Sequence, residues 1–156
     1  MEIENMEIRE DDLSGAETRG LIARHLADMR ETSPEESCHA LDADALQDPS
    51  VTFWSAWIDG RVAGIGALKR LDAVNGEVKS MRVEDAFRGS GVGRALVRHI
   101  IRTARRHGLR AIWLETGAQP EFAAARGLYA SEGFVECGPF ASYREDPHSV
   151  FMRLDL

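Results

Sequence analysis

A glycine-rich segment between a predicted strand and a long amphipathic helix constrains the fold of this chain most strongly. The segment reads Arg88-Gly89-Ser90-Gly91-Val92-Gly93, and apolar residues then recur at helical spacing over Gly91–His107. Glycines permit positive φ angles and a close approach of the backbone to a ligand, and the start of a helix presents unpaired N–H groups at the positive end of its macrodipole. The segment therefore predicts a site for a phosphate or pyrophosphate, to which Arg88 and Arg94 can add charged hydrogen bonds.

Other phosphate-binding loops fit this segment less well. A nucleotide P-loop ends in Gly-Lys-Ser/Thr, whereas this chain has Gly93-Arg94-Ala95, so that interpretation fails. The dinucleotide fingerprint G-x-G-x-x-G matches Gly89 and Gly91, but Arg94 takes the place of its third glycine, and too little chain follows to complete a doubly wound fold. A nicotinamide-binding domain stays a minor alternative, as does a glycine-rich helix start that binds no ligand.

The charge of the chain is acidic overall and basic in one stretch. A formal net charge of -7 argues against a nucleic-acid partner, because phosphates need a basic surface. Arginines are nevertheless concentrated between positions 88 and 110, where no acidic residue occurs: Arg88, Arg94, Arg98, Arg102, Arg105, Arg106 and Arg110. This pattern predicts a local basic face for an anionic ligand.

The other patterns predict one mixed α/β domain over residues 6–156, after a tail formed by residues 1–5. Strands are predicted over Met6–Arg9, Val51–Ile58, Arg61–Leu71, Glu77–Val83, Ala111–Thr116, Phe134–Cys137 and Val150–Leu154. Helices are predicted after the capping-box pattern Ser14–Glu17, after Ser33-Pro34 with an end at Leu41 or Leu46, over Gly91–His107 and over Phe122–Ser131. Asp59-Gly60 and Asn75-Gly76 are predicted turns, and Gly64 and Gly66 mark a bulge or a close backbone approach.

Two motifs in this order resemble those of the GCN5-related N-acetyltransferases, the GNAT superfamily. Arg88-x-x-Gly91-x-Gly93 resembles the R/Q-x-x-G-x-G/A motif of that family, and the segment 125–134 resembles its second signature, A-x-x-L-Y followed by G-F. The resemblance is strongest over 51–154. The order of the predicted elements, β-α-α-β-β-β-α-β-α-β-β, is also similar to that fold. The resemblance implies a mostly antiparallel sheet, with two splayed central parallel strands at Glu77–Val83 and Ala111–Thr116.

A narrower resemblance links the chain to a subgroup of small bacterial acetyltransferases. It rests on Ser33-Pro34, Glu36-Ser37, the segment 39–42 and the run from Tyr143 through Asp146-Pro147 to Met152. This subgroup does not define a substrate.

The resemblance implies that acetyl-CoA binds as a cosubstrate in the opening between the splayed strands. The backbone around Met81, Arg82 and Val83 would bind the pantetheine and polarise the thioester carbonyl, whose oxygen gains negative charge in the transition state. The pyrophosphate would be held by Arg88, Gly89, Ser90, Gly91, Val92, Gly93 and Arg94. Arg126, within the second motif, is a further candidate for cofactor binding.

Three side chains are candidates for proton transfer. Tyr129 matches the family's proton donor to the leaving thiolate, although it could instead pack a helix onto the sheet. Glu77 lies eleven residues before Arg88, as the base does in histone-type members of the family; the alternatives are a solvated strand-end glutamate or a chain of water molecules. His39 borders the expected acceptor site and could be a surface histidine, whereas His25, His99 and His107 are expected to be solvated.

The resulting hypothesis is an enzyme that transfers acetyl from acetyl-CoA to an amine of a small molecule or peptide, by direct attack in a ternary complex. The alternative from another class is a non-catalytic acyl-CoA sensor. No metal is expected, because no group of Asp, His or Cys has ligand spacing. Without an apolar span or a signal pattern, the chain is expected to be cytoplasmic with no membrane partner. A homodimer is compatible with the sequence but not required by it.

Overall fold

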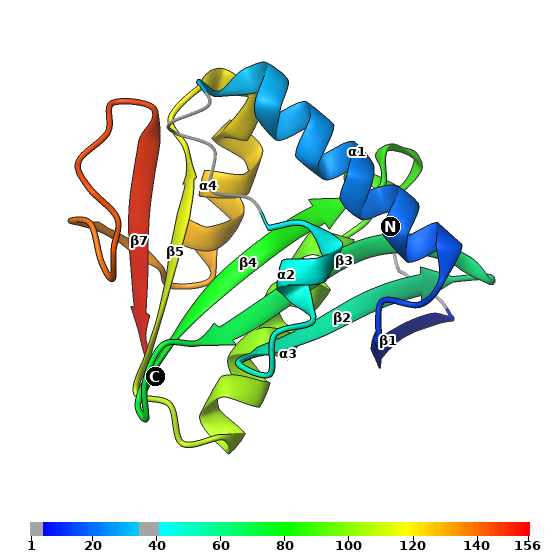
Figure 1. The fold of residues 1–156 in the computed structure, drawn as a ribbon, viewed down its shortest axis with the longest axis horizontal. Helices are drawn as coiled ribbons and strands as arrows, with labels where there is room; N and C mark the ends of the chain where they lie inside the picture. Colours follow the sequence, from blue (N-terminus) through cyan, green and yellow to red (C-terminus); the bar gives the residue numbers. More distant parts are fainter. Residues whose placement is uncertain (1–4, 35–40) are drawn as a thin grey trace.

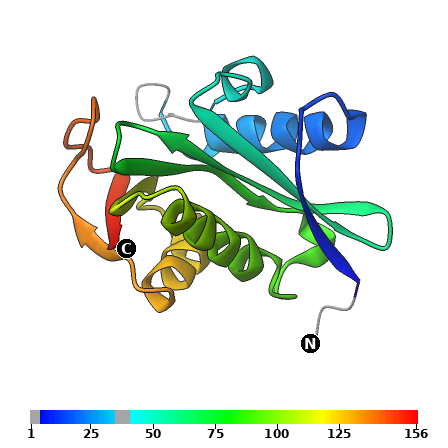
Figure 2. The same ribbon diagram turned by 90° about the horizontal axis from the view of Figure 1, so that it is seen from below.

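The computed structural model describes residues 5–34 and 41–156, which form one seven-stranded sheet with helices on both faces (Figures 1 and 2). The strands are β1 (Met6–Glu10), β2 (Val51–Ile58), β3 (Arg61–Arg70), β4 (Asn75–Val83), β5 (Ala111–Gly117), β6 (Val135–Cys137) and β7 (Ser149–Asp155). The helices are α1 (Ala16–Thr32), α2 (Ala43–Leu46), α3 (Val92–Arg106) and α4 (Ala123–Ser131), with short 3-10 turns η2 (Asp85–Phe87) and η3 (Pro120–Phe122). This order confirms the predicted α/β fold.

The sheet is antiparallel except between its two central strands. Its order is β1-β2-β3-β4-β5-β7-β6, and only β4 and β5 run parallel. These two strands pair over Asn75–Glu77 and Ala111–Trp113 and then part, while β5 stays paired with β7 along its whole length. The predicted splay of the central strands is therefore confirmed, and Figure 1 shows the two strands separating above their paired ends.

A β-bulge lies on β4 beyond the point where it leaves β5. Ser80 has a φ of 57°, and the pairing with β3 shifts so that Lys79 faces Ala67 whereas Arg82 faces Ile65. A bulge adds an unpaired residue, bends its strand and reverses which face the following side chains occupy. Lys79 consequently shares a face with Ala67 of the core beneath α1, while Met81 contacts the core beneath α3.

Helices α1 and α2 lie on one face of the sheet, and α3 and α4 lie on the other (Figure 2). One core lies between the sheet and α3 and α4, and a smaller core lies beneath α1 and α2. Gly64 and Gly66 face α3, where an added Cβ would come within 2.9 Å of Val92 Cγ1 and 2.7 Å of Met81 Sδ, respectively. The prediction of a close approach at these glycines is confirmed, and it lets α3 lie directly against β3.

The first two helices differ from their predicted starts. Helix α1 begins at Ala16 with Gly15 as its N-cap, and the Ser14 hydroxyl donates to Asp12 Oδ1 (2.6 Å) instead of capping the helix. The capping-box prediction is therefore wrong, because Asp12 engages the serine first. Helix α2 is a single turn capped by Asp42, which accepts a hydrogen bond from the amide of Ala45 (2.8 Å). The start predicted after Ser33-Pro34 falls on 35–40, outside the described residues.

The predicted turn at Asn75-Gly76 is also wrong, because these residues begin β4. The carboxylate of Asp72 makes the turn by accepting hydrogen bonds from the amides of Val74 and Asn75, each at 2.8 Å. Gly76 serves close packing: a Cβ there would meet Leu109 Cδ1 at 2.9 Å. The Asp59-Gly60 turn is confirmed, with positive φ at both residues.

Candidate active site

The glycine-rich segment forms a concave start to α3. Gly89 and Gly91 have φ angles of 77° and 93°, and the first hydrogen bond of the helix runs from the amide of Ala95 to the carbonyl of Gly91 (3.0 Å). Five amides donate no backbone hydrogen bond to any described residue: those of Gly89, Gly91, Val92, Gly93 and Arg94. We call this group of amides the cradle. Unpaired amides at a helix start are suited to an anion, and the left-handed glycines turn the chain into this shape.

The arginines of this region do not form one continuous face toward the cradle. Arg88 is exposed and pairs with Asp85 at 2.8 Å, whereas the guanidinium of Arg94 contacts Glu132 at the end of α4 (2.6 Å). Arg98 contacts Glu132 as well (2.6 Å), and its hydrogen bond, followed by that of Arg94, holds the pKa of Glu132 below its ordinary value. The remaining arginines lie further along or beyond α3: Arg102, Arg105, Arg106 and Arg110.

Distance along the helix separates these later arginines from the cradle. At a rise of about 1.5 Å per residue, the end of α3 lies roughly 20 Å from its start. The basic face predicted for one anionic ligand is therefore divided, and the cradle offers mainly backbone amides.

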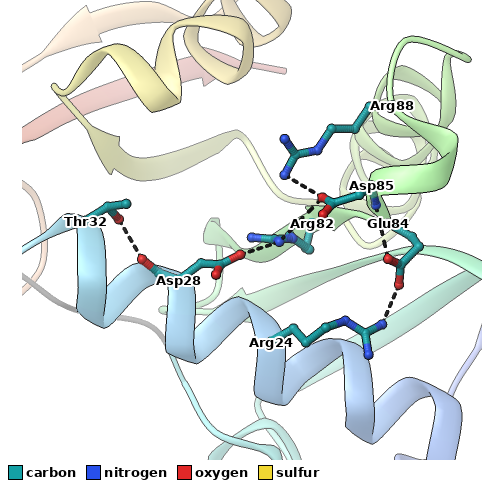
Figure 3. A network of polar contacts seen from close by, with 7 residues as sticks. All are labelled: Arg24, Asp28, Thr32, Arg82, Glu84, Asp85 and Arg88. Atoms are coloured by element: carbon teal, nitrogen blue, oxygen red, sulfur yellow. Dashed lines mark hydrogen bonds and ion pairs between the residues drawn. The ribbon is translucent and has the colours of Figure 1, made fainter.

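The end of β4 is tied to α1 and to the start of the cradle by a polar network (Figure 3). The Arg82 guanidinium pairs with Asp28 of α1 and lies 3.8 Å from Asp85, which also pairs with Arg88. Arg24 of α1 pairs with Glu84 one turn away. Only the backbone of Arg82 was expected to have a role, but its side chain also fixes α1 to β4.

His25 of α1 lies beneath this network, against the sheet. It is buried, and burial together with the neighbouring charge of Arg82 lowers its pKa to about 4, so the imidazole is neutral at neutral pH. The expectation of a solvated His25 is wrong, because the buried face of α1 includes this position. His99 also departs from that expectation, since it packs edge-on against Trp54 at 5.3 Å, whereas His107 is exposed as predicted.

Tyr129 of α4 is buried with its ring edge-to-face against Phe134 at 5.8 Å. Burial raises the pKa of its hydroxyl, which is therefore protonated at neutral pH. The same α4 is fastened to the end of β5 by Arg126, which donates to the carbonyls of Gly117 (2.6 Å) and Gln119 (3.0 Å). Tyr129 thus belongs to the core between the sheet and α4, and Arg126 fixes this helix to the end of β5.

Glu77 lies on the α1 face of β4, at the last residue that pairs with β5. It is only 4% exposed, and its Oε2 accepts hydrogen bonds from Lys79 Nζ (3.1 Å) and from the hydroxyl of Tyr143 (2.5 Å). The alternative of a solvated strand-end glutamate is therefore wrong. Burial, followed by the charge of Glu77, raises the pKa of Tyr143.

The connection between β6 and β7 brings Tyr143 to this place. Its ring packs against Phe140 (4.8 Å) and Phe151 (5.5 Å), and Phe140 stacks on Trp113 of β5 (5.4 Å). At the start of β7, the Ser149 hydroxyl donates to Glu115 of β5 (2.7 Å). Tyr143 was expected only as part of the subgroup resemblance, because no local pattern shows that position 143 reaches position 77.

The remaining predictions concern His39, a metal ion and a membrane span. His39, the third candidate for proton transfer, lies outside the described residues. Within the described residues, no three His, Cys, Asp or Glu side chains gather closely enough to hold a metal ion. No helix in the described part of the chain is both long and apolar enough to cross a membrane.

Comparison with known proteins agrees with this geometry. The sequence profile of the acetyltransferase (GNAT) family matches residues 19–134. The chain is 48% identical to the N-acetyltransferase YsnE of Bacillus subtilis over 97% of this chain and all of YsnE, and 47% identical to YedL of Escherichia coli over 96% and 94%. Both relatives are described as uncharacterized N-acetyltransferases. An IAA acetyltransferase of Azospirillum brasilense is 41% identical over 86% of each chain.

Solved structures show the same fold. A candidate acyl-CoA N-acyltransferase from Klebsiella pneumoniae superposes with a TM-score of 0.78 at 28% identity, over 97% of both chains. A GNAT acetyltransferase from Elizabethkingia anophelis with acetyl-CoA bound gives 0.70 at 16% identity, over 98% of this chain and 99% of that one. With the family profile covering most of the chain, the protein belongs to the GNAT family of acyltransferases.

Proposed function

We propose that the protein transfers an acetyl group from acetyl-CoA to an amine of a small molecule or peptide, by direct attack of the amine in a ternary complex. The observation that carries this proposal is that the cradle follows the end of β4, the strand that parts from β5, and that Gly93 packs against Val83 of that strand. A row of unpaired amides suits a pyrophosphate, and the parted strands leave an unpaired edge of β4 for an extended ligand. The described residues therefore fit acetyl-CoA.

The cradle amides from Gly89 to Arg94 would hold the pyrophosphate, and Arg88 would leave Asp85 to contact it. The backbone around the bulge, from Met81 to Val83, would bind the pantetheine arm and donate to the carbonyl oxygen. When bound, acetyl-CoA supplies an acetyl group activated as a thioester. Arg94 and Arg126 would act mainly by fixing α3, α4 and the end of β5, because their guanidinium groups are already engaged.

The reaction forms an amide C–N bond, breaks the thioester C–S bond and releases CoA and one proton. Glu77 would accept the proton that the acceptor's ammonium group must lose before attack. Tyr129 would donate a proton to the leaving sulfur, for which its protonated, buried hydroxyl is suited. Glu77 faces α1 while the cradle lies at the start of α3, so the acceptor would enter from the α1 side of the sheet.

The test is release of free CoA from acetyl-CoA in the presence of a panel of amines: amino acids, polyamines, peptides and aminated sugars, with IAA added because of the Azospirillum relative's name. Turnover with at least one acceptor, together with a mass increase of one acetyl group on it, supports the proposal. Tight binding of acetyl-CoA without turnover on any acceptor contradicts it and favours an acyl-CoA sensor. Binding of NAD in place of acetyl-CoA would contradict both.

A further inference from the structure

The motif around Tyr143 is not accounted for by the cradle, by the bulge or by Tyr129. It belongs to the connection between β6 and β7, far in sequence from the strand that carries Glu77. Its hydroxyl nevertheless lies 2.5 Å from Glu77 Oε2 and 3.0 Å from Lys79 Nζ. Three polar groups from two separate segments thus contact one another on the α1 face of the sheet.

The contacts on Glu77 are unequal between its two oxygens. Lys79 and Tyr143 both donate to Oε2, whereas Oε1 accepts no hydrogen bond from any residue in 5–34 or 41–156. The side chains of Glu77 and Lys79 are only 5% and 10% exposed, so neither contact is a loose surface pair. Among the described residues, two donors therefore hold Oε2 and none holds Oε1.

We propose that Lys79 and Tyr143 position Glu77 as the proton acceptor, holding Oε2 so that Oε1 takes the proton from the acceptor's ammonium group. This inference rests on the proposed function. The N–H bond of the ammonium breaks, its electron pair stays on nitrogen, and the proton passes to Oε1 and then to water. Glu77 precedes Met81 by four strand residues, about 13 Å at about 3.3 Å per residue. A chain of water molecules would carry the proton from the amine to Oε1 over this distance.

Charge and packing explain why two donors are needed. A buried carboxylate loses its hydration, and an ammonium group together with a hydroxyl replaces it. Other charges facing the pair come from neighbouring strands: Lys69 of β3 stands opposite Glu77 in the register, and Glu115 of β5 acts on Tyr143. The ring of Tyr143 packs against both Phe140 and Phe151, so the loss of one contact leaves the other.

The central experiment is a pH profile of kcat/KM for Tyr143→Phe, with the fastest acceptor of the panel. This change removes one hydroxyl and keeps the ring. Loss of a hydrogen bond to a charged group is expected to lower kcat about 10- to 100-fold, with KM for acetyl-CoA unchanged. Because the lost donor favours the ionised carboxylate, the acid limb of the profile should move to higher pH. An unchanged acid limb and an unchanged kcat would overturn the proposal.

Two controls separate positioning from folding. Phe151→Leu weakens the packing of the connection but keeps the Tyr143 hydroxyl, so it should lower thermal stability without moving the acid limb. Lys79→Arg should retain more activity than Lys79→Met, since it keeps a cationic donor near Oε2. An acid limb moved equally by Phe151→Leu would show that Tyr143 matters for structure only, which overturns the proposal.

A double variant tests whether Tyr143 acts through Glu77. If it does, adding Tyr143→Phe to Glu77→Gln should lower kcat less than twofold below that of Glu77→Gln alone. A double variant whose loss of kcat equals the product of the two single-variant losses would overturn the proposal. Absence of turnover by the unmodified protein with every amine would reject the proposed function itself, and that result is distinct from turnover that ignores Tyr143.

Discussion

The two sides of the sheet carry the two parts of the proposed site, and these parts differ in how they are built. On the α3 side, the cradle is made by consecutive residues, and its donors are backbone amides oriented by two left-handed glycines. On the α1 side, side chains distant in sequence meet only in the folded chain: Tyr143 contacts Glu77 of β4, and Ser149 contacts Glu115 of β5. We call these four side chains the floor. We therefore expect the cradle to tolerate most side-chain changes and the floor to depend on each of its side chains.

The largest expected effect comes from breaking the cradle. Gly91→Val places a β-branched residue at a φ of 93°, a conformation that only glycine adopts readily, at the N-cap of α3. We expect acetyl-CoA affinity to fall at least 100-fold by isothermal titration, while circular dichroism shows that the variant still folds. Gly127→Ala is the matched control, because its Cβ would meet nothing within 4 Å. An affinity that survives Gly91→Val would show that the amides are not the binding site.

The next largest effect is expected on kcat, from a change of Glu77 in the floor. Glu77→Gln removes the negative charge while retaining the shape, and general base catalysis typically contributes about 10²- to 10⁴-fold. We expect kcat to fall within this range with acetyl-CoA affinity unchanged, as measured by steady-state release of CoA and by titration. A fall in affinity of the same size would place Glu77 in the cofactor site and erase the contrast between the two sides.

A smaller effect concerns stability at the α1 face. The pKa of His25 is lowered to about 4 in the folded protein, against an ordinary value near 6.5. The unfolded chain therefore binds a proton more readily between these values, and the free energy of unfolding falls as pH decreases from 6.5 to 4. His25→Gln should flatten this part of the curve, measured by urea denaturation at several pH values. An identical slope in the variant would mean that His25 takes up its proton while folded.

The smallest expected effect is on stability, from the control variant Gly127→Ala. Gly127 lies within α4, and a Cβ added there would meet nothing within 4 Å. Gly127→Ala should raise the free energy of unfolding by about 0.5–1 kcal/mol, because alanine loses less backbone entropy in a helix. Denaturant melts check this value, and acetyl-CoA affinity should not change.

The same contrast explains how much the sequence could predict. The strands, α3 and the cradle follow from local patterns, since Gly89 and Gly91 need only their neighbours to set their angles. The errors have non-local or competing causes: Asp12 engages Ser14 before it can cap α1, Asp72 makes the turn assigned to Asn75-Gly76, and His25 faces the sheet. The contact of Tyr143 with Glu77 spans 66 residues, and no spacing rule indicates it.

Acetyl-CoA titration of the unmodified protein, Gly91→Val and Tyr143→Phe, run beside CoA release by the same three samples, tests the central claim most directly. We expect Gly91→Val to lose both binding and turnover, and Tyr143→Phe to bind normally while its turnover falls about 10- to 100-fold. Equal loss of binding in both variants, or normal binding by Gly91→Val, would contradict the division of the site into a backbone cradle and a side-chain floor.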